Sequence, residues 1–458
     1  MRNLLIYIIL ISFSVPLISQ ENMGIENSNY APTNSLWLNP SSIADNKAFL
    51  DINIAGASAF MGNNLAYVKG GMPYSASAFQ SLSFNLEGNK KSLYVDAGIH
   101  GPSASLSIGD HGFALSTSLR NYQRAKKILG ELMDLLFREL EYDPEYGVKK
   151  SYNNISLNSL SWMEVGFSYA YLVKKFDREI WQGGITVKRM WGLASFSSIF
   201  NTIEYTLVDP QVVTVHDFES QYATASGFGS GTGWGIDLGF TYKYTTDPVM
   251  SYTPHNKLCR KMDYYHKIGV SLLDWGSIKF TDNALLNTID ISEEPHTENS
   301  TEGLNENDVI YNLQNNNFDN TTNTFKAKLP LALSVQYDYN FGYNIYLNAT
   351  AIHPLRGSGK IGIQRPPLFA FTPRYERKRF EASLPITLWD YKYPSIGFAV
   401  RLNSIVIGTD RLIPYILPID TYRADIYFNL KITIFDRKKC RPAKPRRASD
   451  KVRCPSYH

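Results

Sequence analysis

The segment from Ala424 to Phe435 places the strongest constraint on how this chain can fold. Every even position from 426 to 434 carries a large apolar residue, and the odd positions carry Asp, Tyr, Asn, Lys and Thr. Because successive side chains of a strand point to opposite faces, this alternation predicts a strand with one apolar and one polar face. A soluble β-sandwich also contains such strands. Here the pattern recurs in about a dozen segments behind a secretory signal, which favours an all-β fold, a transmembrane antiparallel β-barrel of 12–14 strands.

The first residues have the features of a secretory signal peptide. A basic start is followed by an apolar run from Leu4 to Ile18, which is too short for a membrane helix, and cleavage after Ser19 is expected. No cysteine follows this run, so lipoprotein processing is not expected. No other stretch approaches the ~20 apolar residues of a membrane helix, and a membrane protein without such helices must be a closed barrel. The predicted organisation is a signal peptide (1–19), a periplasmic N-terminal segment (20–47), an outer-membrane barrel (48–435) and a basic periplasmic tail (436–458).

The connections between the strands agree with a barrel. Short, turn-rich links alternate with long connections, and outer-membrane barrels have short periplasmic turns and long outer loops. The predicted strands are 48–60, 92–109, 111–122, 158–174, 181–195, 231–245, 264–280, 324–339, 343–355, 378–389, 395–408 and 422–435. The short links include 109–112, 175–178, 340–342 and 390–394, and the long connections are 61–91, 123–157, 196–230, 281–323, 356–377 and 409–421. This rhythm predicts twelve strands with both termini in the periplasm, and an extra hairpin in 61–91 or strands within 196–230 would give fourteen.

Charged residues in the strands fall on the polar faces and are predicted to point into the lumen. A Lys or Arg facing lipid at mid-depth would cost roughly 2–4 kcal/mol. The predicted lumen residues are Asp51, Arg120, Glu164, Lys188, Asp237, Lys243, Lys267, Lys326, Lys328, Asp338, Arg401 and Lys431. Their mixed signs would suit either a water-filled channel or an internal ion-pair network. The inward faces show no apolar surface, so a transporter of apolar substrates is not expected.

The tail after Phe435 is the sharpest change in composition. Residues 436–458 contain nine basic and two acidic residues, whereas the whole chain carries a net charge of only +4. The tail is predicted to be flexible and to dock on an acidic periplasmic protein or on anionic headgroups, and a solvated tail is the alternative. Nucleic acid is not an expected partner. The predicted docking residues are Arg437, Lys438, Lys439, Arg441, Lys444, Arg446 and Arg447.

The three cysteines lie on the predicted periplasmic side, where disulfides persist. A disulfide between Cys440 and Cys454 is predicted, and a bond from Cys259 to the tail or unpaired thiols are the alternatives. Neither their spacing nor a nearby ligand cluster favours a metal site. No metal or cofactor is therefore predicted.

Two of the long connections have patterns of their own. Between Ala125 and Leu140, leucine-rich positions recur at helical spacing and predict a helix that packs over the barrel mouth. The connection 281–323 is acidic and rich in asparagine, and it contains no Lys or Arg. It lacks the residue order of a calcium-binding loop, so it is predicted to be solvated.

Several motifs support a family resemblance. They are Asn29 to Asp45 with its Leu38-Asn39-Pro40 motif, Gly101-Pro102-Ser103, Gly269 to Gly276, and Asp425 to Phe428. Together they resemble a family of outer-membrane barrels from Bacteroidota whose domain has no known function. The Leu-Asn-Pro motif is also similar to the start of the type IX secretion and gliding barrels of the PorP/SprF kind. The resemblance covers most of residues 25–435 and implies an outer-membrane barrel without an active site.

Enzymatic motifs are missing from the sequence. It has no Gly-x-Ser-x-Gly elbow, no His-Glu-x-x-His and no phosphate-binding loop, so an enzyme is not expected. The glycines at alternate positions from 227 to 235 do not match Gly-x-Gly-x-x-Gly and are interpreted as a flexible loop that enters a strand. The leading hypothesis is a non-enzymatic scaffold or subunit of an envelope complex in the outer membrane of a Gram-negative bacterium. The predicted partners are membrane lipid and periplasmic or outer-membrane proteins. The alternative is a channel for small polar solutes.

Overall fold

The computed structural model describes residues 22–70, 82–85, 90–128, 146–209, 212–246, 263–291, 296–299, 319–357 and 359–435. Several predicted features lie outside these residues. They are the signal peptide, the three cysteines, the tail with all its docking residues, most of the acidic connection and the predicted helix from residue 129 onward. In the described part of the chain, no helix is long and apolar enough to span a membrane.

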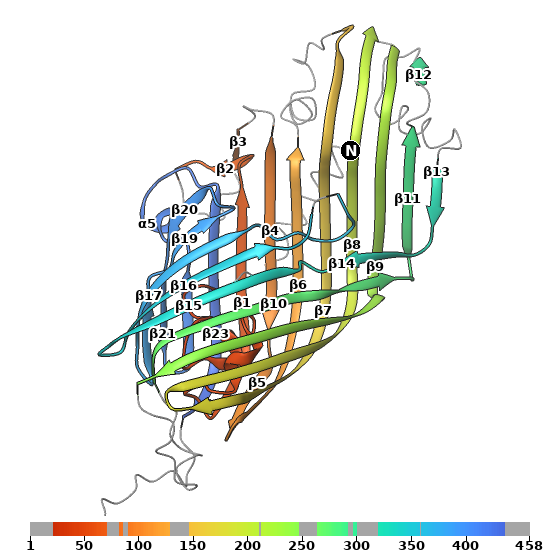
Figure 1. Cartoon of the computed structure of the whole chain (residues 1–458). Coiled ribbons are helices and arrows are strands. Elements are labelled where there is room, and N and C mark those ends of the chain that lie inside the picture. Colours follow the sequence, from red (N-terminus) through yellow and green to blue (C-terminus); the bar gives the residue numbers. More distant parts are fainter. Residues whose placement is uncertain are drawn as a thin grey trace, which may run out of the picture.

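A single antiparallel sheet closes on itself to form the barrel (Figure 1). The first barrel strand, β1 (Leu50–Asn63), pairs with the last, β23 (Arg423–Ile434), and on its other side with β4 (Lys91–His100) and β5 (Ser103–Ile108). Through this pairing the described strands form a closed wall, as a strand-built membrane protein requires. The predicted all-β barrel is confirmed, with fourteen strands in the described residues.

Several of the fourteen strands are interrupted by short breaks. Strands that continue one another, such as β4 and β5, count as one. The other barrel strands are β6 (His111–Ile128); β7 (Lys149–Phe176); β8 (Glu179–Asp209); β9 (Val212–Thr245); β10 (Tyr264–Phe280) with β11 (Ala284–Ile291) and β12 (His296–Asn299); β13 (Asp319–Thr322) with β14 (Phe325–Lys328) and β15 (Ala332–Gly342); β16 (Ile345–Pro354); β17 (Leu368–Glu376); β18 (Phe380–Ser383) with β19 (Ile386–Trp389); β20 (Tyr393–Ile396) with β21 (Phe398–Leu402); and β22 (Ile405–Thr409).

The alternation that suggested the fold decides which side chains face outward. In β23, Asp425 and Tyr427 are buried inside the barrel, whereas Ile426 and Phe428 are about 40% exposed on its outer surface. The same division holds for Phe167 in β7, which is also exposed on the outside. An outer surface of large apolar side chains suits hydrocarbon as the surrounding solvent.

Two barrel strands were not predicted, and they account for the difference between the twelve predicted strands and the fourteen in the structure. The predicted connection 356–377 contains β17, in which both faces begin with apolar residues, so the alternation is hidden. The predicted strand 395–408 is a hairpin of β21 and β22, and Asn403 adopts a left-handed φ of 50° in its tight turn. The hairpin within 61–91 does form, but β2 (Ala66–Val68) and β3 (Leu82–Phe84) make a separate two-stranded sheet.

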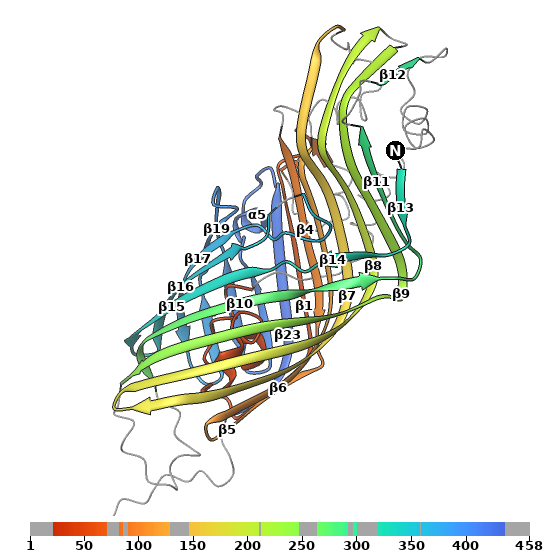
Figure 2. The same ribbon diagram turned by 45° about the vertical axis from the view of Figure 1, so that its right-hand side comes forward.

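The predicted connection 196–230 is also strand. β7, β8 and β9 are 28, 31 and 34 residues long, and they rise well beyond the rest of the barrel (Figures 1 and 2). The glycine-rich run lies within β9 and is not a loop, although Gly227 and Gly229 have positive φ. Residues 125–128 of the predicted helix belong to β6.

The two ends of the barrel differ in their connections. We call the end with the short turns 109–110, 177–178, 343–344 and 403–404 the turn end, and the opposite end the loop end. The link 390–392 lies at the loop end, although it was predicted among the periplasmic turns. The extra strand β17 reverses the direction of the chain before this link, which moves it to the other side.

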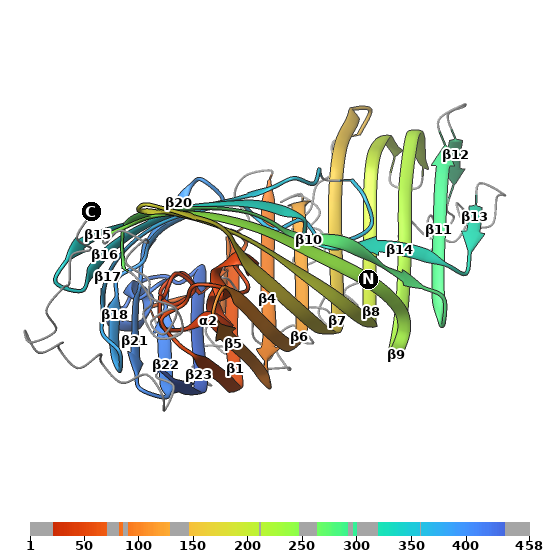
Figure 3. The ribbon, with the colours of Figure 1, turned by 60° about the horizontal axis from the view of Figure 1, so that its bottom comes forward.

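Residues 22–49 lie inside the barrel, and we call them the N-terminal plug (Figure 3). The sequence predicts residues 20–47 as a periplasmic N-terminal segment that precedes the barrel, and it does not predict that they fill the lumen. The plug contains the short α-helix α2 (Pro32–Ser35) and the 3-10 helix η1 (Pro40–Ile43), and nearly all its residues are buried. Another one-turn helix, α5 (Ile413–Ile416), lies between β22 and β23.

Candidate functional site in the barrel lumen

Glycines on the inner wall make room for the plug. A Cβ atom on Gly184 would lie 2.5 Å from the Ser41 nitrogen, and one on Gly112 would lie 2.6 Å from the carbonyl carbon of Ile43. On β9, a Cβ on Gly239 would come within 2.8 Å of the Pro40 ring. Contacts this short with backbone atoms cannot be relieved by rotating a side chain. These three wall glycines therefore let η1 lie directly against the sheet.

Asn39 fixes η1 to the wall at this place. Its side-chain oxygen accepts a hydrogen bond from the Ser41 nitrogen at 3.0 Å, which caps the 3-10 helix. Its amide nitrogen donates to the side chain of Gln336 at 3.0 Å. The Ser41 and Thr241 hydroxyls are 2.7 Å apart. The Leu38-Asn39-Pro40 motif is therefore a docking element of the plug.

Hydroxyls on the wall also bind the plug backbone. Serines of β5, β10 and β18 each donate to a main-chain carbonyl of the plug. These bonds join Ser107 to Ala44 at 3.0 Å, Ser271 to Leu38 at 2.6 Å, and Ser383 to Gly24 at 2.6 Å. These three bonds hold the plug through its main chain at separate places along its length.

Ion pairs secure the plug near the turn end. Lys243 of β9 pairs with Asp45 at 3.0 Å, and Lys47 pairs with Asp263 at 3.0 Å. Burial alone would lower the pKa of the Lys47 ammonium. The Asp263 carboxylate and the Tyr346 hydroxyl outweigh this effect and raise that pKa above its ordinary value. Lys47 is therefore held charged where the plug leaves the lumen.

A layer of buried charges lies beside the plug on the loop-end side, and Asp274 is at its centre. Arg120 binds both carboxylate oxygens of Asp274 at 2.9 Å, and Lys188 binds one of them at 2.8 Å. Lys188 also contacts Asp237 at 2.7 Å, and Arg120 lies 3.5 Å from Glu164. We call these five residues, together with Arg365, the Asp274 cluster. It contains three positive and three negative side chains, so the charges balance.

Asp274 points into the lumen because β10 is irregular there. Its φ is +55°, and the register with β9 shifts between Leu272 and Trp275. The Asp274 nitrogen donates to Asp237 at 2.7 Å, which stabilises this conformation. Asp274 is not among the predicted lumen residues, because a regular alternation that turns Lys267 inward would turn Asp274 outward.

The connection between β16 and β17 enters the lumen from the loop end. We call its described residues, 355–357 and 359–367, the β16–β17 loop. Arg365 donates to Asp274 at 2.6 Å, and Arg124 donates to the Gln364 carbonyl at 2.7 Å. The Ile363 nitrogen donates to the carbonyl of Lys328 at 3.2 Å, and its side chain is fully buried. No sequence pattern had marked this connection as part of the lumen.

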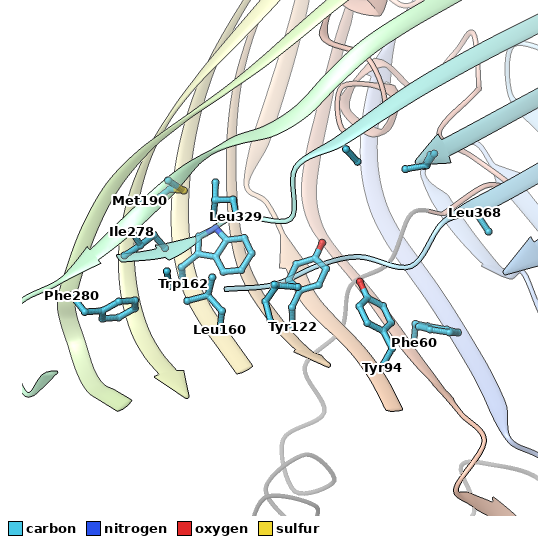
Figure 4. Packing of buried hydrophobic residues seen from close by; sticks show 14 of the residues in the cluster. Phe60, Tyr94, Tyr122, Leu160, Trp162, Met190, Ile278, Phe280, Leu329 and Leu368 are labelled. Atoms are coloured by element: carbon cyan, nitrogen blue, oxygen red, sulfur yellow. The ribbon is translucent and has the colours of Figure 1, made fainter. Parts of the chain in front are cut away.

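The inward-facing side chains change from charged to apolar over two residues of the strands. Arg120 of β6 is followed on the same face by Tyr122, and Lys188 of β8 by Met190, each nearer the loop end. In β7, which runs in the opposite direction, Trp162 stands in that position. Figure 4 shows the resulting cluster of buried apolar side chains. Its members larger than alanine are Met23 and Leu38 of the plug, Ile363 of the β16–β17 loop, and Phe60, Tyr94, Tyr122, Leu160, Trp162, Met190, Ile278, Phe280, Phe325, Leu329, Ile352, Leu368 and Trp389 of the wall.

This apolar region overturns the expectation that the inward faces lack an apolar surface. The rings of Tyr122 and Trp162 are stacked with centroids 5.5 Å apart, and those of Phe280 and Phe325 are 5.2 Å apart. The prediction was based on the charged residues of the inward faces. It did not take into account the apolar residues that lie two positions further along the same strands. The side chains of this cluster are at most 8% exposed and pack together, and we call them the apolar layer.

Most of the predicted lumen residues do point inward. Ten of the twelve are buried inside the barrel or in contact with the plug: Asp51, Arg120, Glu164, Lys188, Asp237, Lys243, Lys267, Asp338, Arg401 and Lys431. Several form further ion pairs, such as Lys431 with Asp51 at 2.8 Å and Arg401 with Glu381 at 3.0 Å. The internal network is thus the arrangement found, with pairs that compensate one another.

Lys326 and Lys328 were placed in the lumen wrongly. Both are exposed, whereas Phe325 and Ala327 are buried inside. β14 ends at Lys328 and β15 begins at Ala332, and the phase of the alternation changes across this break. The sequence predicts one continuous strand over 324–339, and this assigns all four residues of β14, 325–328, to the wrong faces.

The described residues around the plug enclose a polar cavity of about 40 Å³. Its lining includes Gln182, Thr241 and Lys267 on the wall and Glu26 and Asn39 on the plug. No group of three or more His, Cys, Asp or Glu side chains in the described part of the chain is arranged to hold a metal ion.

Comparison with solved structures finds other barrels. The Ralstonia pickettii toluene transporter TbuX matches with 10% identity and a TM-score of 0.40, over 92% of this chain and 98% of that one. A Pseudomonas aeruginosa FadL homologue matches with 12% identity and a TM-score of 0.44, over 89% of this chain and 95% of that one. At this level the likeness concerns the barrel fold alone.

Comparison of the sequence gives a firmer result. No curated protein matches it. Residues 40–410 match the model of a family of unknown function, DUF5723, in agreement with the resemblance to a barrel family without a known function. The match covers well over half of the chain, which therefore belongs to the DUF5723 family.

Proposed function

We propose that this protein is a plugged outer-membrane channel for small apolar or amphipathic solutes. The observation that carries this proposal is the apolar layer, to which several strands contribute on the loop-end side of the Asp274 cluster. Porins that pass polar solutes have a polar, water-filled interior. An apolar inner wall instead favours solutes that gain about 25 cal/mol for each Å² of apolar surface that leaves water.

The lumen is closed in the state described. The N-terminal plug occupies the turn-end half, and the β16–β17 loop reaches the Asp274 cluster from the other side. A steady open pore for polar solutes does not fit this arrangement. Transport requires the plug to shift, and its contacts suit such a movement because many are hydrogen bonds that water can replace.

Uptake of an apolar dye by cells that express the full chain tests this function. N-phenyl-1-naphthylamine fluoresces when it reaches the membrane interior, and the protein should increase its rate of uptake. Leu160→Lys places a charge in the apolar layer and should remove most of that gain. Leu160→Met, which keeps an apolar side chain of similar size, should retain it. Equal uptake by both variants and the unmodified protein would contradict the proposal.

A scaffold role is the second candidate, and one observation favours it. About 9–11 residues suffice for a strand to cross a membrane, but β7, β8 and β9 are 28 to 34 residues long. Their extension beyond the barrel provides a sheet surface for another protein of the cell envelope. Stoichiometric co-purification that depends on this extension would support the role, and a lone barrel in gentle detergent would count against it.

A further inference from the structure

We infer that Asp274 couples the N-terminal plug to the β16–β17 loop. These two segments close the lumen, and the coupling makes them open it together. The inference rests on the plugged state of the proposed channel but not on the identity of its solute. The plug and the loop come from distant parts of the sequence and reach the same cluster from opposite ends of the lumen.

The plug reaches the cluster through Trp37. The Lys188 ammonium lies 5.8 Å from the centre of the Trp37 ring, and this ring also packs on His100 with centroids 4.8 Å apart. The next plug residue, Leu38, is held by the hydrogen bond from Ser271 to its carbonyl. Trp37 therefore covers Lys188 from the turn-end side and keeps water away from its ammonium group.

The loop reaches the cluster through Arg365. This side chain is 4% exposed, and its guanidinium donates to Asp274 at 2.6 Å. Gln364 is held at the same time by Arg124 and by Lys126, whose ammonium lies 2.9 Å from its side-chain oxygen. Ile363 is buried beside them. The loop thus covers Asp274 from the loop-end side.

The two carboxylate oxygens of Asp274 make separate contacts toward the plug and toward the β16–β17 loop. One oxygen accepts from Lys188, which the plug covers, and the other accepts from Arg365, which the loop supplies. Arg120 bridges both oxygens and fixes the orientation of the carboxylate. The Asp274 side chain therefore makes one charged contact on the plug side and one with the β16–β17 loop.

The coupling follows from the burial of these charges. Ion pairs are strong where water is excluded and weaken sharply when water enters. If the plug withdraws Trp37, water reaches Lys188 and Asp274, and the contact that holds Arg365 weakens. If the loop withdraws Arg365, the cluster is left with an uncompensated charge and becomes hydrated beside Trp37. Coupling between two sites must act in both directions.

Two single-cysteine reporters can measure this coupling in the purified full chain. In a background with Cys259, Cys440 and Cys454 replaced by Ser, Ile43→Cys reports on the plug and Ile363→Cys reports on the loop. Both native side chains are fully buried, so each cysteine should react slowly with a polar thiol reagent while its segment is docked. The rate of modification then measures how often that segment opens.

Gly184→Ala should release the plug, because its Cβ would meet the Ser41 backbone. We expect this change to raise the modification rate of Ile363→Cys, on the loop, by about tenfold, within the usual range of coupling between sites. The matched control is Gly183→Ala. Its Cβ would meet only Val173, at 3.9 Å, and it should leave the rate unchanged. Faster modification of Ile43→Cys without any change at Ile363→Cys would overturn the inference.

Arg365→Gln tests the opposite direction and does not depend on the behaviour of the glycine variant. It removes the loop's charged contact with Asp274, and it should raise the modification rate of Ile43→Cys in the plug. An unchanged rate at Ile43→Cys would equally overturn the coupling. Circular dichroism of each variant confirms that the barrel is folded. Neither result requires a solute, so a failure of dye uptake and a failure of coupling can be told apart.

Discussion

At the scale of single residues, the neighbours Gly183 and Gly184 show how the two faces of one strand differ. A Cβ on Gly184 would collide with the plug backbone, whereas one on Gly183 would reach only Val173. The sequence shows two adjacent glycines and does not distinguish them. Their difference arises from a segment more than 140 positions away along the chain, around Ser41.

The charge at Asp274 should be the most sensitive single position in the lumen. Asp274→Asn keeps the shape of the side chain but leaves Arg120, Lys188 and Arg365 without their shared carboxylate. We expect a loss of about 3–5 kcal/mol of unfolding free energy, as for other buried ion pairs that lose one partner. Urea unfolding followed by tryptophan fluorescence measures the change.

A matched control for this change is Asp282→Asn. Asp282 is exposed just after β10, so its substitution should alter the unfolding free energy by less than about 0.5 kcal/mol. A loss at Asp274 no larger than this would show that the cluster does not stabilise the barrel.

At the scale of elements, the alternation predicted most strands and failed where a strand is interrupted. Lys326 and Lys328 were assigned to the wrong face because the alternation changes phase between β14 and β15. β17 was missed because Leu368 and Phe369, which open it, are both apolar although they point in opposite directions. Period-two patterns identify a strand only while a single phase is kept and the two faces differ in polarity.

The extension of β8 and β9 should be separable from the barrel. Ile203 and Phe218 are paired across these strands, so residues 204–217 can be replaced by an Asn-Gly turn that closes the hairpin at that pair. We expect the shortened protein to insert into the outer membrane and to keep its barrel, since the shortened β8 and β9 are still longer than the about 9–11 residues that a strand needs to cross a membrane. Heat-modified mobility in gel electrophoresis and circular dichroism would show this.

The same deletion bears on the scaffold role. If the extension binds a partner, the shortened protein should lose the co-purifying protein while its dye uptake is retained. A shortened chain that fails to form a barrel would show instead that the extension is part of the folding unit.

At the scale of the whole molecule, the barrel could be predicted from the sequence and the filling of its lumen could not. The outer surface depends on repeated local alternation, which one strand after another displays. The plug depends on contacts between distant segments, such as Asn39 with Gln336 and Lys47 with Asp263. Such contacts leave no local pattern, although Asn39 already stood in the motif that carried the family resemblance.

The position of a bound apolar solute tests the proposed channel most directly. Crystals of the full-length protein soaked with bromobenzene can be examined by anomalous diffraction from bromine. We predict bromine inside the barrel among the side chains of the apolar layer, on the loop-end side of Asp274 and near Trp162 and Phe280. Bromine found only on the outer, lipid-facing surface, with none inside the lumen, would contradict a channel for apolar solutes.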